Sequence, residues 1–406
     1  MKKLTKEQTA VFCLLRRALW GETLQLPENV DWEAAGKFAK EQDVVSFLYD
    51  GAAAANAPVP GALLQKWRSG MLQGVVRNER LLRAQDELLG WLREESIPVV
   101  VLKGSSVSRY YPQPDLRILG DIDILVAQPD IDRVKGILEQ HGYRFCEHDH
   151  NFHLSFTRAD AYVELHYNVT KLPDSDGGRA AGEVIDTFLQ DIEEGTVHDY
   201  VFPVISEPNQ AVMLLLHMIR HMFSSGIGLR QLCDWAVYMA AIDPARFEGE
   251  TLPVLERCGL RNYAAAATAA CIRYLGLSEK GMDWCSTVEE ETGELFLSDI
   301  LRSGNMGQSN REGMGGLLVD SERFGKKTNP VQALFKQLTQ LAYKNFPVAE
   351  KCRLLLPMFW AYLPLRYYVR TLTGKRPKKS LMKIMKASVS QRDLLETVKA
   401  FVVEDR

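Results

Sequence analysis

Two aspartates one residue apart are the side chains of this sequence best suited to chemistry. Asp121 and Asp123 lie in the run 120–126, which reads GDIDILV. In a β-strand, residues i and i+2 point to the same face, so the two carboxylates project together while Ile122 and Ile124 project to the other side. Buried carboxylates repel each other unless a cation compensates them. A hard divalent cation, Mg²⁺ or Mn²⁺, fits because it takes oxygen ligands and recruits substrate phosphates.

A glycine–serine turn supplies a matching anion site. Gly104 and Ser105 follow the apolar run 99–102, and a helix is expected to begin near Ser106. A strand that turns through Gly-Ser into a helix leaves N–H groups aimed at whatever lies beyond, which suits a triphosphate. Asp-x-Asp or Gly-Ser alone is common outside catalytic sites, so the prediction depends on the two occurring together.

A third carboxylate occurs in the stretch 162–166, which reads YVELH. Alternation of apolar and polar residues predicts a half-buried strand, with Glu164 and His166 on one face and Val163 and Leu165 on the other. Glu164 is a candidate general base or shared metal ligand. The alternative is an edge-strand glutamate in water, since alternation also predicts half-exposed polar positions.

These motifs together resemble the nucleotidyltransferases of the DNA polymerase β superfamily, and most nearly a largely uncharacterised bacterial branch, the NTP transferase 5 family. The motifs that carry the resemblance are Lys103-Gly104-Ser105, Arg117, GDIDILV at 120–126 and VELH at 163–166. The resemblance implies that Gly104 and Ser105 seat the triphosphate, that Asp121 and Asp123 hold two metals, and that Glu164 completes the triad. The gap between Ser105 and Asp121 is wider than usual in the superfamily.

The resemblance implies a metal-dependent nucleotidyltransferase that moves a nucleoside monophosphate from an NTP, with ATP expected first, to an acceptor hydroxyl and releases pyrophosphate. Lys103 and Arg117 are natural triphosphate contacts, Arg117 through its bidentate fork. Lys103 at a strand end can also simply extend toward solvent. A non-catalytic nucleotide-binding or membrane-surface scaffold that retains the fold is the alternative function. The absence of Walker-type and His-Arg-Asp motifs argues against a kinase.

Further polar residues are candidates for the acceptor pocket. His217 and His221 lie at i and i+4 of an expected helix, and Arg230 and Asp234 have the same spacing and could form an ion pair. With His166, the two histidines and Arg230 are the residues expected to line the pocket. Zinc binding by the histidines and a hydrogen-bonded structural pair are the alternatives.

The fold class expected is α/β (α+β), with a small mixed β-sheet core flanked by N-terminal and C-terminal helical regions. The expected helices span 7–19, 32–54, 62–74, 76–95 and 130–141, and strands are expected near 99–102, 120–126, 143–146, 153–156 and 162–167. The expected regions are 1–77 (N-terminal helical), 78–205 (nucleotidyltransferase core) and 206–406 (C-terminal helical).

Composition indicates a protein of the cytoplasm. The 406 residues carry a net charge of −3, which argues against a general nucleic-acid binder and against template-directed polymerase activity. The seven cysteines are scattered without a Cys-x-x-Cys pair, as expected in a reducing compartment. The N-terminus lacks the apolar core of a signal peptide, so no export is predicted.

Two C-terminal segments have open interpretations. The glycine-rich stretch 304–316 is either a lid over the substrate or a flexible linker. The stretch 354–386 is apolar and aromatic, then basic, and no acidic residue occurs between Glu350 and Asp393. It could lie on the inner face of an anionic membrane. A buried helix pair with a solvated basic tail, or an RNA contact, are its alternatives.

Overall fold

The computed structural model describes residues 4–149, 152–159, 161–224, 226–286, 290–304, 352–372 and 400–403, together with positions 288 and 398 and scattered positions between 335 and 349. The glycine-rich stretch beyond Gly304 and the basic residues after position 372 lie outside the described residues. The expectations for these two segments therefore stay predictions.

Four helices open the chain: α1 (Lys6–Trp20), α2 (Trp32–Glu41), α3 (Val45–Ala54) and α4 (Gly61–Glu94). The single helix expected over 32–54 is wrong, because Asp43 adopts a left-handed φ of +58° and separates α2 from α3. The two helices expected at 62–74 and 76–95 are one helix, α4. Gly74 lies inside α4. A Cβ atom at this position would come within 2.2 Å of Ile118 Cδ1, so the close packing of Ile118 against the helix explains why a residue without a side chain stands here. The expected boundary at 77/78 falls within α4.

The core is one seven-stranded mixed sheet in the order β3-β4-β5-β2-β1-β7-β6. Its strands are β1 (Val99–Val101), β2 (Ile122–Val126), β3 (Arg144–Asp149), β4 (His153–Arg158), β5 (Ala161–His166), β6 (Ile192–Val197) and β7 (Tyr200–Ile205). The expected α/β class is confirmed and the five expected strands are present, but β2 begins at Ile122, so Asp121 immediately precedes the strand instead of lying within it. The β6–β7 hairpin was not expected from the sequence, and it extends the sheet beyond β1.

The central strands fix the register of the functional residues. β2 is antiparallel to β1, with Val101 opposite Ile124, and parallel to β5, with Asp123 opposite Glu164. Because side chains alternate along a strand, this pairing places the side chains of Asp123 and Glu164 next to each other on one face of the sheet.

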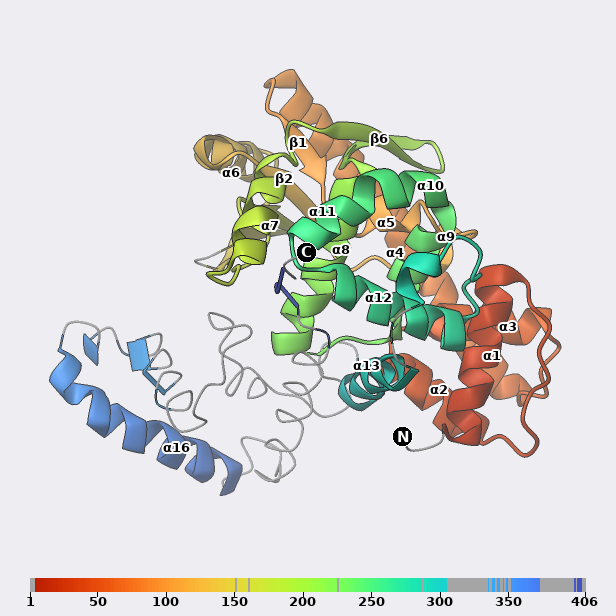
Figure 1. The fold of residues 1–406 in the computed structure, drawn as a ribbon. Helices are drawn as coiled ribbons and strands as arrows, with labels where there is room; N and C mark the ends of the chain where they lie inside the picture. The colour runs from red at the N-terminus through yellow and green to blue at the C-terminus, as the bar shows by residue number, and fades with distance from the viewer. Residues whose placement is uncertain are drawn as a thin grey trace.

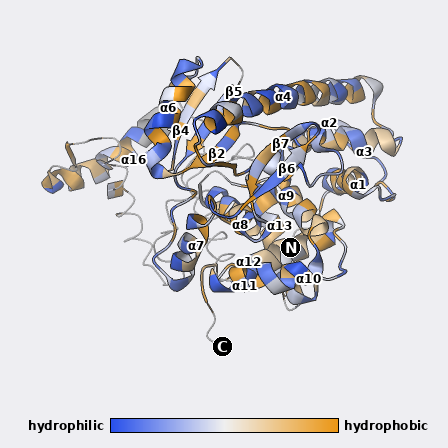
Figure 2. Ribbon diagram, turned by 90° about the horizontal axis from the view of Figure 1, so that it is seen from above, coloured by the Kyte–Doolittle hydropathy of each residue, from blue (hydrophilic) through white to orange (hydrophobic). Residues whose placement is uncertain are grey.

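The two faces of the sheet are covered by different helices. α4 and α6 (Ile131–Gln140) pack on one face, where Leu88 and Val134 join Ile122 and Val163 in a buried apolar layer. Figure 2 shows α4 as a long helix that continues past the sheet toward α2 and α3. On the other face, Val100 and Leu125 belong to the larger core shared with the C-terminal helices. The carboxylates of β2 and β5 point to that second face.

Most of the helices that follow β7 join the larger core on the second face of the sheet, whereas the last of them, α16 (Leu356–Leu372), contributes to a separate small apolar cluster (Figure 1). The other longer ones are α8 (Glu207–Ser224), α9 (Leu229–Ala241), α12 (Arg261–Ala270) and α13 (Glu290–Ser303). Two short helices, α10 (Pro244–Arg246) and α11 (Leu252–Arg257), lie between α9 and α12, whereas α5 (Ser105–Ser108) and α7 (Asp176–Asp186) connect strands of the sheet. Leu354, just before α16, is 90% exposed, and Leu365, within α16, is 60% exposed. Within the described residues, no helix is both long and apolar enough to cross a membrane.

Candidate metal and nucleotide site

Three carboxylates converge where β2 and β5 lie side by side. Carboxylate oxygens of Asp121, Asp123 and Glu164 all lie within 4.8 Å of one another. Lys103 joins them because β1 runs antiparallel to β2, and the N–H of Leu102 donates to the Asp123 carbonyl at 3.0 Å. The four side chains are called the carboxylate cluster below.

Burial makes the negative charges of this cluster costly. The Asp123 side chain is fully buried and that of Glu164 is 18% exposed. Burial, and then the negative charge of Asp123, raise the pKa of the Asp121 carboxyl above its ordinary value. Two neighbouring carboxylates that resist joint ionisation form the kind of site that a divalent cation stabilises.

Lys103 supplies one positive charge to the cluster. Its ammonium lies 2.9 Å from Asp123 Oδ1 and 3.8 Å from Glu164 Oε2. Burial favours the neutral amine, but the three carboxylates outweigh burial and raise the pKa of Lys103 to about 12. Lys103 therefore remains charged at neutral pH and does not merely extend into solvent.

His166 lies against the same carboxylates. Its Nε2 is 3.0 Å from Asp123 Oδ1 and 3.3 Å from Glu164 Oε2. Burial favours the neutral ring, but the hydrogen bonds to Asp123 and Glu164 outweigh it and raise the pKa of His166. Burial likewise opposes ionisation of Glu164, but the His166 hydrogen bond and the Lys103 charge lower its pKa to about 2. The structure thus places His166 among the candidate metal ligands, whereas the sequence indicated the acceptor pocket.

One oxygen of the cluster is left without a partner. Asp123 Oδ2 is buried and has no hydrogen-bond partner among the described residues. An uncompensated carboxylate oxygen in the protein interior is costly, so an oxygen-seeking cation is the partner that its chemistry fits. Asp121, Asp123 and Glu164 would hold this ion.

The glycine–serine turn lies at the edge of the cluster. Gly104 has a φ of +71°, a conformation that glycine adopts without strain, and its position lets the chain turn directly from Lys103 into α5. α5 is a single turn, so the expected helix is much shorter than a full anion-binding helix. The Ser105 hydroxyl donates to Gln85 Oε1 at 2.7 Å and is held by α4 in this conformation.

Arg117 lies in a second buried cluster, called the arginine cluster below. Its guanidinium donates to both oxygens of Asp234, through Nε at 2.7 Å and Nη2 at 2.8 Å. The Tyr111 hydroxyl donates to Asp234 Oδ1 at 2.7 Å. The sequence predicted that the Arg117 guanidinium binds a triphosphate through two of its N–H groups. In the structure, Asp234 accepts both of these hydrogen bonds. The expected Arg230–Asp234 pair is wrong, because Arg230 pairs with Asp43 at 2.5 Å instead.

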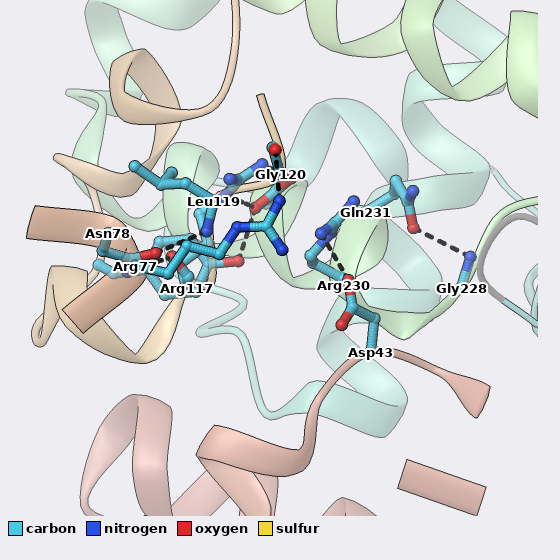
Figure 3. Close-up of polar contacts among 11 residues, drawn as sticks. Asp43, Arg77, Asn78, Arg117, Leu119, Gly120, Gly228, Arg230 and Gln231 are labelled. Carbon is cyan, nitrogen blue, oxygen red and sulfur yellow. Dashed lines mark hydrogen bonds and ion pairs between the residues drawn. The ribbon is translucent and has the colours of Figure 1, made fainter. Parts of the chain in front are cut away.

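The loop before Asp121 is anchored to α4 (Figure 3). Asn78 Nδ2 donates to the carbonyls of Asp115 and Arg117, each at 3.1 Å, and Asn78 Oδ1 accepts from the N–H of Leu119 at 2.7 Å. Arg77 donates to the Gly120 carbonyl at 2.8 Å. These bonds fix the backbone immediately before the first aspartate.

α8 and α9 bring the expected acceptor-pocket residues to the same side of the sheet. The rings of His217 and His221 lie 4.4 Å apart. Burial, and then the charges of Lys103, Arg220 and Arg230, lower the pKa of His221 to about 3. Burial and the neighbouring His221 likewise lower the pKa of His217. Both imidazoles are therefore neutral at physiological pH, while Arg230 counteracts the negative charge of Asp121.

His153 is a site residue that the sequence analysis missed. It is the antiparallel partner of His166 across β4 and β5, and its Nε2 lies 3.7 Å from Glu164 Oε1. The only sequence signal was alternation in the strand at 153–156, which does not reveal the pairing register.

A mixed sheet with clustered carboxylates on neighbouring strands, beside a lysine and a glycine–serine turn, defines an α/β protein with a candidate divalent-cation site. Residues 28–276 match a family model described as an uncharacterised nucleotidyltransferase. The match covers more than half of the chain, so the protein belongs to this nucleotidyltransferase family. It includes every site residue described above. No curated protein matches the chain.

Proposed function

We propose that the protein transfers a nucleoside monophosphate from an NTP to a hydroxyl group of an acceptor and releases pyrophosphate, with Mg²⁺ or Mn²⁺ bound at the carboxylate cluster. The observation that carries this proposal is the convergence of Asp121, Asp123 and Glu164, with no described residue paired to the buried Asp123 Oδ2. Family membership supports the reaction class. ATP is the donor to test first.

The chemistry requires positioning and charge neutralisation more than a protein nucleophile. Divalent ions bound to such carboxylates stabilise the attacking and leaving oxygens of an in-line displacement at phosphorus. Lys103, charged and adjacent to Gly104, is placed to neutralise phosphate oxygens at the edge of the cluster. Glu164, with its pKa lowered to about 2, remains ionised at neutral pH and therefore serves as a metal ligand more readily than as a proton carrier.

The acceptor side of the site is proposed to lie under α8 and α9. His217 and His221 are neutral and can exchange hydrogen bonds with a hydroxyl acceptor, and Arg230 contributes a positive charge near Asp121. This arrangement favours a small polar acceptor over a nucleic-acid strand, in line with the balanced net charge of the chain.

The test is binding and turnover of each NTP with Mg²⁺ or Mn²⁺, followed by calorimetry and pyrophosphate release, for wild type and for Asp121→Asn/Asp123→Asn. We expect the double variant to lose metal-dependent binding, and its turnover to fall by about 10³-fold, or about 4 kcal/mol of transition-state stabilisation. Asp132→Asn is the matched control, because Asp132 is exposed on α6. Unchanged turnover in the double variant would refute the proposal. NTP binding without turnover would favour a nucleotide-binding scaffold, and failure of the wild type to bind any NTP would favour a membrane-surface scaffold.

A further inference from the structure

Two histidines face each other beside the proposed magnesium ligands. His153 on β4 is directly opposite His166 on β5, and their ring centroids lie 4.9 Å apart. Ligand atoms of His153, Glu164 and His166 all lie within 4.8 Å of one another. The side chains of these histidines are 11% and 1% exposed, so the group is shielded from water.

The orientation of His166 leaves one ring nitrogen directed at the carboxylates. Its Nδ1 lies 3.3 Å from the carbonyl oxygen of Asn168, to which an Nδ1–H can donate, and its Nε2 faces the carboxylates and would release its proton when a metal ion binds. A histidine that donates one N–H to a backbone carbonyl and presents its other nitrogen to acidic groups has the orientation usual for metal ligands.

The spacing around Nε2 of His166 also matches a metal site. Nε2 lies 3.0 Å from Asp123 Oδ1 and 3.3 Å from Glu164 Oε2. Ligands bound at about 2.0–2.1 Å in tetrahedral or octahedral geometry are separated by about 2.9–3.4 Å. Glu164 presents its other oxygen, Oε1, to His153 at 3.7 Å. Its two oxygens therefore face the two histidines separately.

We propose that His153, His166 and Glu164 form a transition-metal site, distinct from the all-oxygen site at Asp121 and Asp123 but sharing Glu164 with it. Two imidazole nitrogens select an ion such as Zn²⁺ over Mg²⁺, which prefers oxygen ligands. The buried Asp123 links the sites, since Oδ1 faces His166 and Oδ2 has no partner in the described part of the chain. The inference depends on the proposed function only through the shared Glu164.

The test is metal binding without nucleotide. The full-length protein is stripped with a chelator, dialysed against Zn²⁺ in the presence of millimolar Mg²⁺, and its bound zinc is measured by elemental analysis. We expect wild type to retain one zinc per chain, and His153→Gln and His166→Gln to bind it at least about tenfold more weakly. His198→Gln is the matched control, because His198 pairs with Asp115 on the surface. Melting temperatures without metal establish that the variants fold.

A second measurement needs no variant. Wild type loaded with one equivalent of Cu²⁺ in the presence of millimolar Mg²⁺, which occupies the all-oxygen site, should show coupling to histidine nitrogen in its pulsed EPR spectrum. Absence of nitrogen coupling, or zinc retention unchanged in folded His153→Gln, would overturn the inference even if NTP turnover is observed. Histidine-dependent zinc binding in a protein that turns over no NTP would support the inference while the proposed function fails, so the two failures are distinguishable.

Discussion

The carboxylate cluster and the arginine cluster are both buried and charged, yet their charges are balanced in different ways. In the arginine cluster, Arg117 donates to both oxygens of Asp234 and the Tyr111 hydroxyl donates a third hydrogen bond. In the carboxylate cluster, three acids share one lysine, His166 lies against them, and an oxygen of Asp123 has no partner among the residues that the structure describes. The first cluster is balanced by itself, whereas the second keeps an excess of negative charge that a further cation would compensate.

The comparison separates a structural ion pair from a binding site. A buried pair whose donors and acceptors all match holds two segments together, here the loop containing Arg117 and helix α9. A buried group with an excess of one charge is unstable alone and becomes stable when a ligand of opposite charge binds. Burial and charge alone do not distinguish the two roles, but the hydrogen-bond balance does.

Removal of Asp234 should have the largest effect on stability. Asp234→Ala leaves the Arg117 guanidinium buried without its partner, and breaking such a pair costs about 3–5 kcal/mol. We expect urea unfolding to show a loss of this size. Asp132→Ala, an exposed aspartate, is the control and should stay within about 0.5 kcal/mol of wild type.

The opposite outcome would reassign Arg117. If Asp234→Ala were as stable as wild type and NTP binding became tighter, Asp234 would be restraining an arginine that belongs to the triphosphate. The arginine cluster would then be part of the binding site, and the comparison would fail.

The anchor of the loop before Asp121 should give the next largest effect. Asn78→Ala leaves the buried carbonyl of Arg117 and the N–H of Leu119 without their partner, at a cost of about 1–3 kcal/mol. We also expect weaker metal-dependent NTP binding, because Asp121 follows this loop directly. Gln73→Ala, at an exposed position of the same helix, is the matched control. Equal stabilities of the two variants would show that the anchor contributes little.

Sequence reasoning could find the carboxylate cluster because strand alternation is a local rule. Period-two spacing places Asp121 with Asp123, and Glu164 with His166, before any tertiary structure is known. It could not find His153 or the partner of Arg117. His153 depends on the register between β4 and β5, and Asp234 lies 117 residues along the chain from Arg117.

The errors in the predicted helices have similarly specific causes. The two helices expected at 62–74 and 76–95 adjoin at Gly74, a residue that costs about 1 kcal/mol relative to alanine in a helix interior. Its close packing against Ile118 shows instead that α4 continues because tertiary contact favours a residue without a side chain there. The break after α2 depends on one positive φ at Asp43, which composition does not reveal.

The smallest predicted effect tests the excess negative charge directly. The pKa of Asp121 is raised by burial and by Asp123, so the folded protein binds more protons than the unfolded chain between the ordinary pKa of 3.8 and the raised pKa. The free energy of unfolding of the metal-free wild type therefore loses this contribution as pH rises through that interval. Asp121→Asn lacks the contribution and should be more stable than wild type at neutral pH by about 0.2–1 kcal/mol, the size of one relieved like-charge contact.

Divalent metal should make the wild type more stable than Asp121→Asn, the reverse of the order without metal. Saturating Mg²⁺ or Mn²⁺ binds the folded wild type and raises its free energy of unfolding, whereas Asp121→Asn gains less because it has lost a ligand. Urea unfolding of both proteins at several pH values, with and without metal, measures the two effects together. Asp132→Asn should follow wild type throughout. If Asp121→Asn were less stable than wild type without metal, the carboxylate cluster would be balanced by Lys103 and His166 alone and would resemble the arginine cluster.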